Sequence, residues 1–98
     1  MSLSNQQRRY LRGLSHSLKP VVTVAAKGLS ETVLEEIELA LDRHELVKIR
    51  MRGEREIRKA WSDAISQQFS AIRVHQVGHV ACYYRRNVKK PLIEFPGS

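Results

Sequence analysis

KPVVTVAAKGLSETVLEEIELAL, residues 19–41, is the stretch of sequence that decides the fold. Val21 to Val24 predicts a short strand, and an amphipathic helix is predicted from about Ser30, with a loop of mostly small residues at 25–28 between them. The N–H groups in the first turn of a helix are unpaired, and the helix dipole is positive there, so this arrangement attracts anions. Lys27 adds a full positive charge at the same point. We therefore expect the loop to bind a phosphate group.

The start of this helix is specified by its own residues. Ser30 is a suitable N-cap, and Leu29 and Leu34 occupy the two positions of a hydrophobic staple around it. Acidic residues near a helix start stabilise the positive end of the dipole. This stabilising role explains the presence of Glu31, Glu35 and Glu36, and no catalytic role is needed for them.

Five more elements follow from caps, hydrophobic periodicity and turn residues. Two are helices, one of them beginning at a Ser4 capping box, and three are strands, of which the last two form a hairpin. The predicted helices are Ser4–Leu14 and Glu54–Phe69, and the predicted strands are Leu46–Arg52, Ile72–Val77 and Val80–Arg85.

The order helix-strand-helix-strand-helix-strand-strand predicts an α/β fold with a mixed four-stranded sheet and helices packed on it. Two strand-helix-strand crossovers imply parallel pairing of the first three strands, followed by an antiparallel hairpin. The 98 residues suit one domain, with a core at about 3–86 and a tail at 87–98. Two outcomes remain open for the tail, a short edge strand from Leu92 to Phe95 or a frayed end.

The charge of the chain favours a polyanionic partner. Seventeen Lys and Arg residues against ten Asp and Glu residues give a net charge of +7, and the pI is about 10.1. Five of the ten acids fall in the helix after Ser30, so the fold should have a basic surface and an acidic back. Nucleic acid is the partner that this asymmetry predicts first.

The clearest basic pattern lies on the predicted strand at residues 46–52. Lys48, Arg50 and Arg52 alternate there with apolar residues, which places three cations on one face. Two interpretations remain open, protection of an edge strand against aggregation and contact with nucleic acid. The three arginines of the first helix are open in the same way, between a solvated face and phosphate contacts: Arg8, Arg9 and Arg12.

Other residues that often carry chemistry have structural explanations. Cys82 cannot form an internal disulfide and fits a reducing compartment, and with His79 it is too little for a zinc site. Trp61 lies on a helical apolar stripe and should pack in the core. On the hairpin, alternation points four side chains outward if the apolar set faces inward: Arg73, His75, Tyr83 and Arg85. Tyr83 then either stacks on a base or is a half-buried strand residue. The sequence has no Walker loop and no nucleophile with an evident base, so we expect no catalysis, metal, cofactor or small-molecule substrate.

No apolar run approaches the roughly 18 residues that a membrane-spanning helix needs. The N-terminal sequence MSLSNQQRRYLRG also lacks the apolar region of a signal peptide. We therefore expect a cytoplasmic protein without a membrane partner.

The sequence LRGLSHSLKPVV followed by GLSETVLEEI resembles the CRM domain (chloroplast RNA splicing and ribosome maturation) in its stand-alone bacterial YhbY-like form. The resemblance extends through HELVKIR and includes Val77, Gly78, Tyr84 and Arg85 of the hairpin. It implies an RNA-binding domain whose fold is similar to the C-terminal domain of bacterial translation initiation factor three. It also implies association with ribosomal RNA in precursors of the large ribosomal subunit.

The family's usual loop is G-x-x-G, a pattern that clamps backbone nucleotides in KH domains. Here Ala25 stands at the first glycine, which leaves Lys27 and Gly28 as the stronger candidates for contact. The prediction is a monomeric RNA-binding protein of large-subunit assembly, with a protein-binding adaptor on ribosomal proteins and a general RNA chaperone as alternatives. The residues predicted to contact RNA are Lys19, Ala26, Lys27, Gly28, Lys48, Arg50, Arg52, Arg73 and Arg85.

Overall fold

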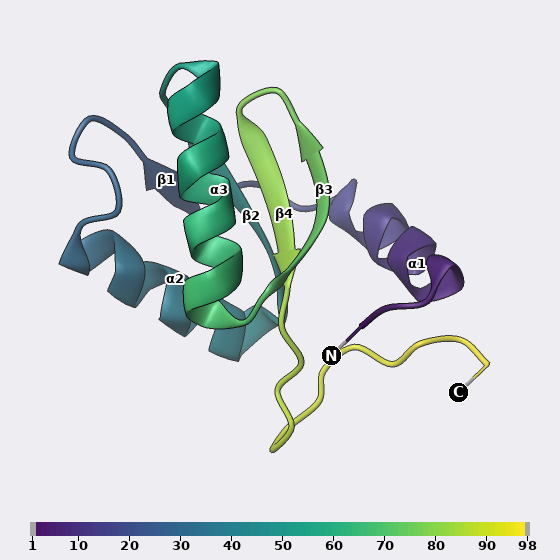
Figure 1. Ribbon diagram of the computed structural model, residues 1–98. Coiled ribbons are helices and arrows are strands. Elements are labelled where there is room, and N and C mark those ends of the chain that lie inside the picture. The colour runs from purple at the N-terminus through teal and green to yellow at the C-terminus, as the bar shows by residue number, and fades with distance from the viewer. Residues whose placement is uncertain (1, 98) are drawn as a thin grey trace.

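Three helices pack on a four-stranded sheet with the strand order β1-β2-β4-β3 (Figure 1). This computed structural model describes residues 2–97. The elements have the predicted types and order, and the α/β class is confirmed. Their bounds are α1 Asn5–Ser15, β1 Val22–Val24, α2 Glu31–His44, β2 Leu46–Met51, α3 Arg55–Phe69, β3 Ile72–Val77 and β4 Val80–Tyr84.

The sheet is mixed as predicted, but one strand pairing differs from the prediction. β1 and β2 are parallel, whereas β4 lies between β2 and β3 and is antiparallel to both. The expected parallel pairing of β2 with β3 is therefore wrong, although the two strands run in the same direction. The cause is burial, because Ala81 to Tyr84 are buried without interruption, as a central strand requires, whereas β3 is buried only at Val74.

Both predicted helix caps are confirmed. The Ser4 hydroxyl accepts from the Gln7 N–H at 3.1 Å, and the Gln7 side chain accepts from the Ser4 N–H at 2.9 Å, which completes a capping box. The Ser30 hydroxyl accepts from the Val33 N–H at 3.3 Å. The hairpin turn is also as predicted, because Gly78 has φ 56° at the first central position of a two-residue turn.

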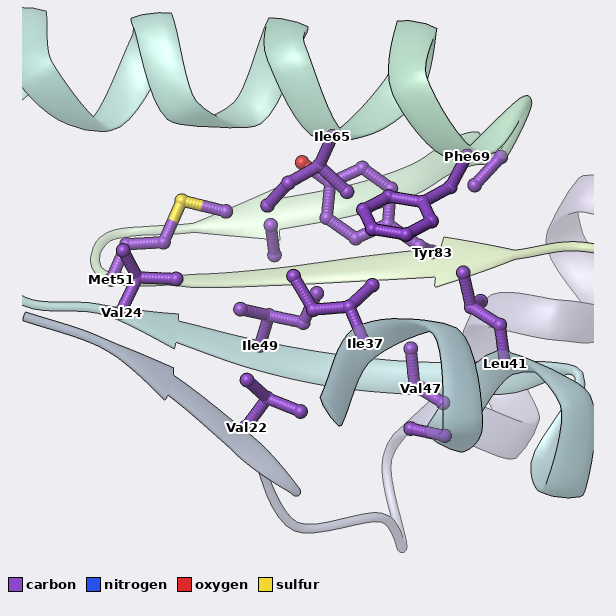
Figure 2. Packing of buried hydrophobic residues seen from close by; sticks show 13 residues of the cluster. Val22, Val24, Ile37, Leu41, Val47, Ile49, Met51, Ile65, Phe69 and Tyr83 are labelled. Atoms are coloured by element: carbon purple, nitrogen blue, oxygen red, sulfur yellow. The ribbon is translucent and has the colours of Figure 1, made fainter. Parts of the chain in front are cut away.

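The larger core lies between the sheet and the two helices α2 and α3 (Figure 2). Strand side chains point from the sheet into this layer. Ile37 and Leu41 of α2 and Ile65 and Phe69 of α3 pack against them. Trp61 is half-buried at the margin of this core, so its predicted packing role is confirmed.

The opposite face of the sheet is covered only in part. There Leu11 of α1 packs on a smaller cluster with Leu46, Val74, Cys82 and Tyr84. Lys48 and Arg50 share this face, beyond the end of α1. Since β2 is paired on both sides, the edge-strand interpretation of its cations is wrong.

The C-terminal tail follows neither predicted outcome, because it has no strand and is nevertheless fixed. The carboxylate of Glu45, a fully buried side chain, accepts from the N–H groups of Asn87 at 2.7 Å, Leu92 at 2.8 Å and Ile93 at 2.7 Å. Farther along, the Phe95 ring packs edge-on against two tyrosine rings. The tail therefore belongs to the folded domain.

Among residues 2–97, no helix has the length and apolar character that crossing a membrane requires.

Candidate functional site

A groove lies on the half of the sheet that α1 leaves uncovered. It encloses about 440 Å³ between the end of α1, the Pro20 segment and the β3–β4 hairpin. We call it the open-face groove. The groove is lined by Ser15, His16, Pro20, Lys48, Arg50, His75, Val77, Val80 and Cys82. None of these side chains carries a carboxylate.

A bulge in β3 decides which side chains reach this groove. Arg73 pairs with Tyr83, and the register then shifts so that His75 pairs with Cys82. Tyr83 belongs to the core under α2 and α3, whereas Cys82 belongs to the opposite face. The bulge therefore places Arg73 and His75 on opposite faces, and the prediction that they point the same way is wrong.

The electrostatics of the groove are positive. Burial, the charge of Arg12 and the further positive charges of His16 and Lys48 lower the pKa of His75. An imidazole in this position resists a proton because burial disfavours its charged form and the nearby cations repel a further charge. At neutral pH, His75 is a neutral ring between cations.

Cys82, at the floor of the groove, has a thiol pKa raised to about 11 by burial. We expect this thiol to react with a thiol reagent at pH 8 on the order of 100-fold more slowly in the folded protein than in the unfolded chain, where the pKa is about 8.5. The measurement is the rate of modification with and without denaturant. Equal rates would contradict the burial of Cys82.

The loop before α2 is a tight turn. The Gly28 N–H donates to the Ala25 carbonyl oxygen at 2.8 Å, which leaves Ala26 and Lys27 exposed at the two central positions. Within the part of the chain that the structure describes, the N–H groups of these two residues have no backbone acceptor. They are the backbone donors of the loop that remain available to an anion, whereas the Gly28 N–H is engaged.

The structure shows that Gly28 also has a conformational role, and its contact with RNA stays a prediction. Its φ is 64°, and a Cβ added there would lie 3.4 Å from the indole nitrogen of Trp61. Glycine is favoured here by the left-handed backbone, because the added Cβ would make only an ordinary van der Waals contact with Trp61.

We expect Gly28→Val to lower the free energy of unfolding by about 2 kcal/mol, because a β-branched residue is strained at this φ. Thermal or denaturant unfolding measures it. Gly28→Asn is the matched control, since asparagine tolerates the left-handed region and should cost less. Equal stabilities of the valine and asparagine variants would contradict a backbone requirement at Gly28.

Ala25→Gly should lower the free energy of unfolding by about 0.4 to 1 kcal/mol through the entropy of the unfolded chain.

Lys27 and Arg52 emerge at the same edge of the sheet. β1 and β2 are parallel with Val24 opposite Met51, so the residues that follow both strands lie at this edge. Arg52 is exposed, and its N–H donates to the Val24 carbonyl oxygen at 2.8 Å. The loop before α2, the start of α3 and the hairpin turn all lie at this end of the molecule (Figure 1). The positive dipole ends of α2 and α3 lie at this end as well, and one acid in each first turn, Glu31 or Glu56, offsets part of their potential.

Lys19 lies near the other end of this surface. It is exposed and lines a cavity together with Lys48. The structure therefore places four predicted cations along the open side of the sheet, from Lys19 to Arg52, and Lys27 in the loop at the end where Arg52 lies. We call this set the basic track, and its members are Lys19, Lys48, Arg50, Arg52 and Lys27.

Arg73 lies outside the basic track, on the α3 side of the hairpin. Its guanidinium donates to the Ser62 hydroxyl at 2.7 Å and to the Asp63 carboxylate at 3.1 Å. It lines a second basic cavity of about 350 Å³. The sequence analysis missed the cations that line this cavity with it, although their helical spacing on one face was a usable signal: Arg55, Arg58 and Lys59.

Arg85 is engaged in ion pairs within the fold. It donates to Glu38 at 2.8 Å and to Asp42 at 2.9 Å, and the hydrogen bond to Glu38 is the main cause that raises its pKa. These two carboxylates offset the charge that was predicted to contact RNA.

Tyr83 was considered as an outward-facing stacking residue, and this orientation is wrong. Its side chain is fully buried, and its hydroxyl donates to the Ser62 carbonyl oxygen at 3.0 Å.

No cluster of three or more His, Cys, Asp or Glu side chains suited to a metal ion occurs within residues 2–97.

Comparison with known proteins adds the family. Residues 3–85 match the model of the CRS1/YhbY (CRM) domain. An RNA-binding protein of Haemophilus influenzae is 42% identical over 85 residues, which are 86% of each chain. A probable RNA-binding protein of Pseudomonas aeruginosa is 40% identical over 90 residues, 91% of this chain and 86% of that one.

A solved structure agrees with these sequence relatives. The solution structure of a hypothetical protein from Staphylococcus aureus, for which RNA binding has been proposed, matches with a TM-score of 0.80 at 26% identity. The match covers 97% of this chain and 100% of that chain. Because the family model spans most of the sequence and the fold agrees, the chain belongs to the CRS1/YhbY (CRM) domain family.

Proposed function

We propose that this protein binds RNA by holding backbone phosphates along the basic track. The observation that carries the proposal is the arrangement of Lys48 and Arg50 on a partly uncovered sheet face, beside a groove without any carboxylate. Three of the ten acids sit elsewhere as ion-pair partners, Glu38 and Asp42 with Arg85, and Asp63 with Arg73. The names of the relatives, which are RNA-binding proteins, support the same partner.

The contacts would be mostly electrostatic. Lysine and arginine along a track neutralise phosphates and release bound counterions, which supplies affinity without reading sequence. At the edge where β1 and β2 end, the free N–H groups of Ala26 and Lys27 add donors that suit a phosphate oxygen. The start of α2 contributes its positive dipole at the same place.

The resemblance to YhbY-like proteins supports a finer proposal. We place the protein in the cytoplasm, on ribosomal RNA of large-subunit precursors, as a monomeric assembly factor that performs no catalysis and needs no cofactor. In gradients of cell lysate at low salt, it should sediment with particles at or just below the size of the large subunit. Recovery only from the top of the gradient would contradict the assembly role.

A protein-binding adaptor is the alternative from another class. In that case the positive charge would only steer encounter with ribosomal proteins, and affinity for naked RNA would be weak. Crosslinking in cells followed by sequencing of the attached RNA distinguishes the alternatives. Reads concentrated on large-subunit ribosomal RNA support the proposal, reads spread over messengers indicate a general RNA chaperone, and an absence of crosslinked RNA indicates the adaptor.

A further inference from the structure

The open-face groove has a composition that phosphate contacts alone do not require. Its rim carries Lys48 and Arg50, but its walls include two imidazoles, His16 and His75, and an aliphatic side chain at Val80. A simple phosphate track would need cations and no apolar wall. Unpaired RNA bases, in contrast, stack on histidine rings and arginine guanidinium planes and cover aliphatic side chains.

The groove also has the dimensions of a ligand site. Its volume of about 440 Å³ lies in the range of small-molecule pockets, roughly 300 to 1,000 Å³. The end of α1 and Pro20 border the groove on one side, and its volume suits a single nucleotide better than a duplex. A single flexible nucleotide could enter from the open side, with its phosphate on the rim.

We propose that the open-face groove binds an unpaired nucleotide of RNA, with the base stacked against His75 and His16 over Val80 and the adjoining phosphates on Lys48 and Arg50. This inference rests on the proposed RNA-binding function and adds to it a preference for single-stranded segments.

The charge state of His75 makes the proposal testable. Partial burial and the cations around it lower the pKa of His75, which favours the neutral ring at pH 7.5, so His75→Ala removes a planar surface without removing a charge. Lys48→Ala removes a charge without removing a ring. The first change should therefore lower affinity at every salt concentration equally, whereas the second should change the salt dependence.

The test uses the full chain, a 12-nucleotide single-stranded RNA and the same RNA annealed to its complement, each titrated at pH 7.5 over several salt concentrations. His75→Ala should weaken single-strand binding about 5- to 150-fold, the range for loss of one stacked base, and leave both the salt slope and duplex binding unchanged. His79→Ala is the matched control, since this exposed histidine of the hairpin turn does not line the groove and its ring contacts Arg58 at 2.8 Å instead. Thermal melts verify that all variants are folded.

The outcomes separate this inference from the function on which it rests. Equal weakening of single-strand and duplex binding, or no change for His75→Ala while the parent binds RNA, would overturn the nucleotide site and leave the RNA-binding proposal intact. If the parent protein binds neither RNA, the proposed function itself fails. A 12-nucleotide RNA backbone that is abasic at every position provides a second test, because without bases it should bind the parent and His75→Ala equally. Loss of affinity with His75→Ala for this abasic backbone would also overturn the proposal.

Discussion

Glu45→Ala is expected to lower the free energy of unfolding by about 3 kcal/mol, a large share of the roughly 5 to 15 kcal/mol of a small domain. The substitution removes a fully buried carboxylate that accepts from Asn87, Leu92 and Ile93 at 2.7 to 2.8 Å. Hydrogen bonds to charged groups are stronger than neutral ones, and three N–H groups would lose their acceptor. The melting temperature should fall on the order of 15 °C.

The backbone at Glu45 allows two sources of this loss to be separated. Glu45 has φ 61°, so alanine would keep the backbone strain, whereas glycine would relieve it. Glu45→Gly should therefore be no less stable than Glu45→Ala, although both lose the carboxylate. Glu36→Ala, an exposed change on α2, is the control and should stay within about 0.5 kcal/mol of the parent. A Glu45→Ala protein as stable as this control would show that the tail is not held by the carboxylate.

The role of Glu45 marks a boundary of sequence reasoning. Ser4 and Ser30 were predicted as caps because a cap and its partner lie within three residues of each other in the chain. Glu45 accepts from N–H groups that lie more than forty residues away in the sequence. No local sequence pattern predicts that these groups come close to Glu45 in the fold.

Sheet order and strand register could not be predicted either, because they also depend on contacts between residues distant in the sequence. The alternation of Lys48 and Arg50 with apolar neighbours predicted their shared face, since that follows from the pleat of a single strand. The position of β4 between β2 and β3 is set by packing over two cores, and the bulge after Arg73 is set by the partner strand. Consequently the prediction that Arg73 and Tyr83 share a face with His75 is wrong, whereas the predicted shared face of Lys48 and Arg50 is confirmed.

RNA affinity is expected to fall about 100-fold between 50 and 200 mM salt, because neutralising about five phosphates on a single strand gives a log-log slope of roughly −3.5. The five cations of the basic track, from Lys19 to Arg52 and Lys27, supply this number of contacts. Titration of a single-stranded RNA over this salt range measures the slope. A slope near zero with binding retained at high salt would contradict electrostatic binding and favour the adaptor.

The double variant Lys48→Ala/Arg50→Ala should reduce the magnitude of this slope by roughly 1.4, since each lost phosphate contact removes about 0.7. The matched control is Arg43→Ala/Lys89→Ala, which removes the same two charges from exposed positions on α2 and the tail, outside the open face. If affinity depended only on net charge, both double variants would weaken binding equally. If the track holds the phosphates, the control keeps nearly the full slope while the track variant loses about two fifths of it. Equal slopes for the two double variants would therefore remove the track from the mechanism, and the cavity lined by Arg55, Arg58 and Arg73 would become the surface to test.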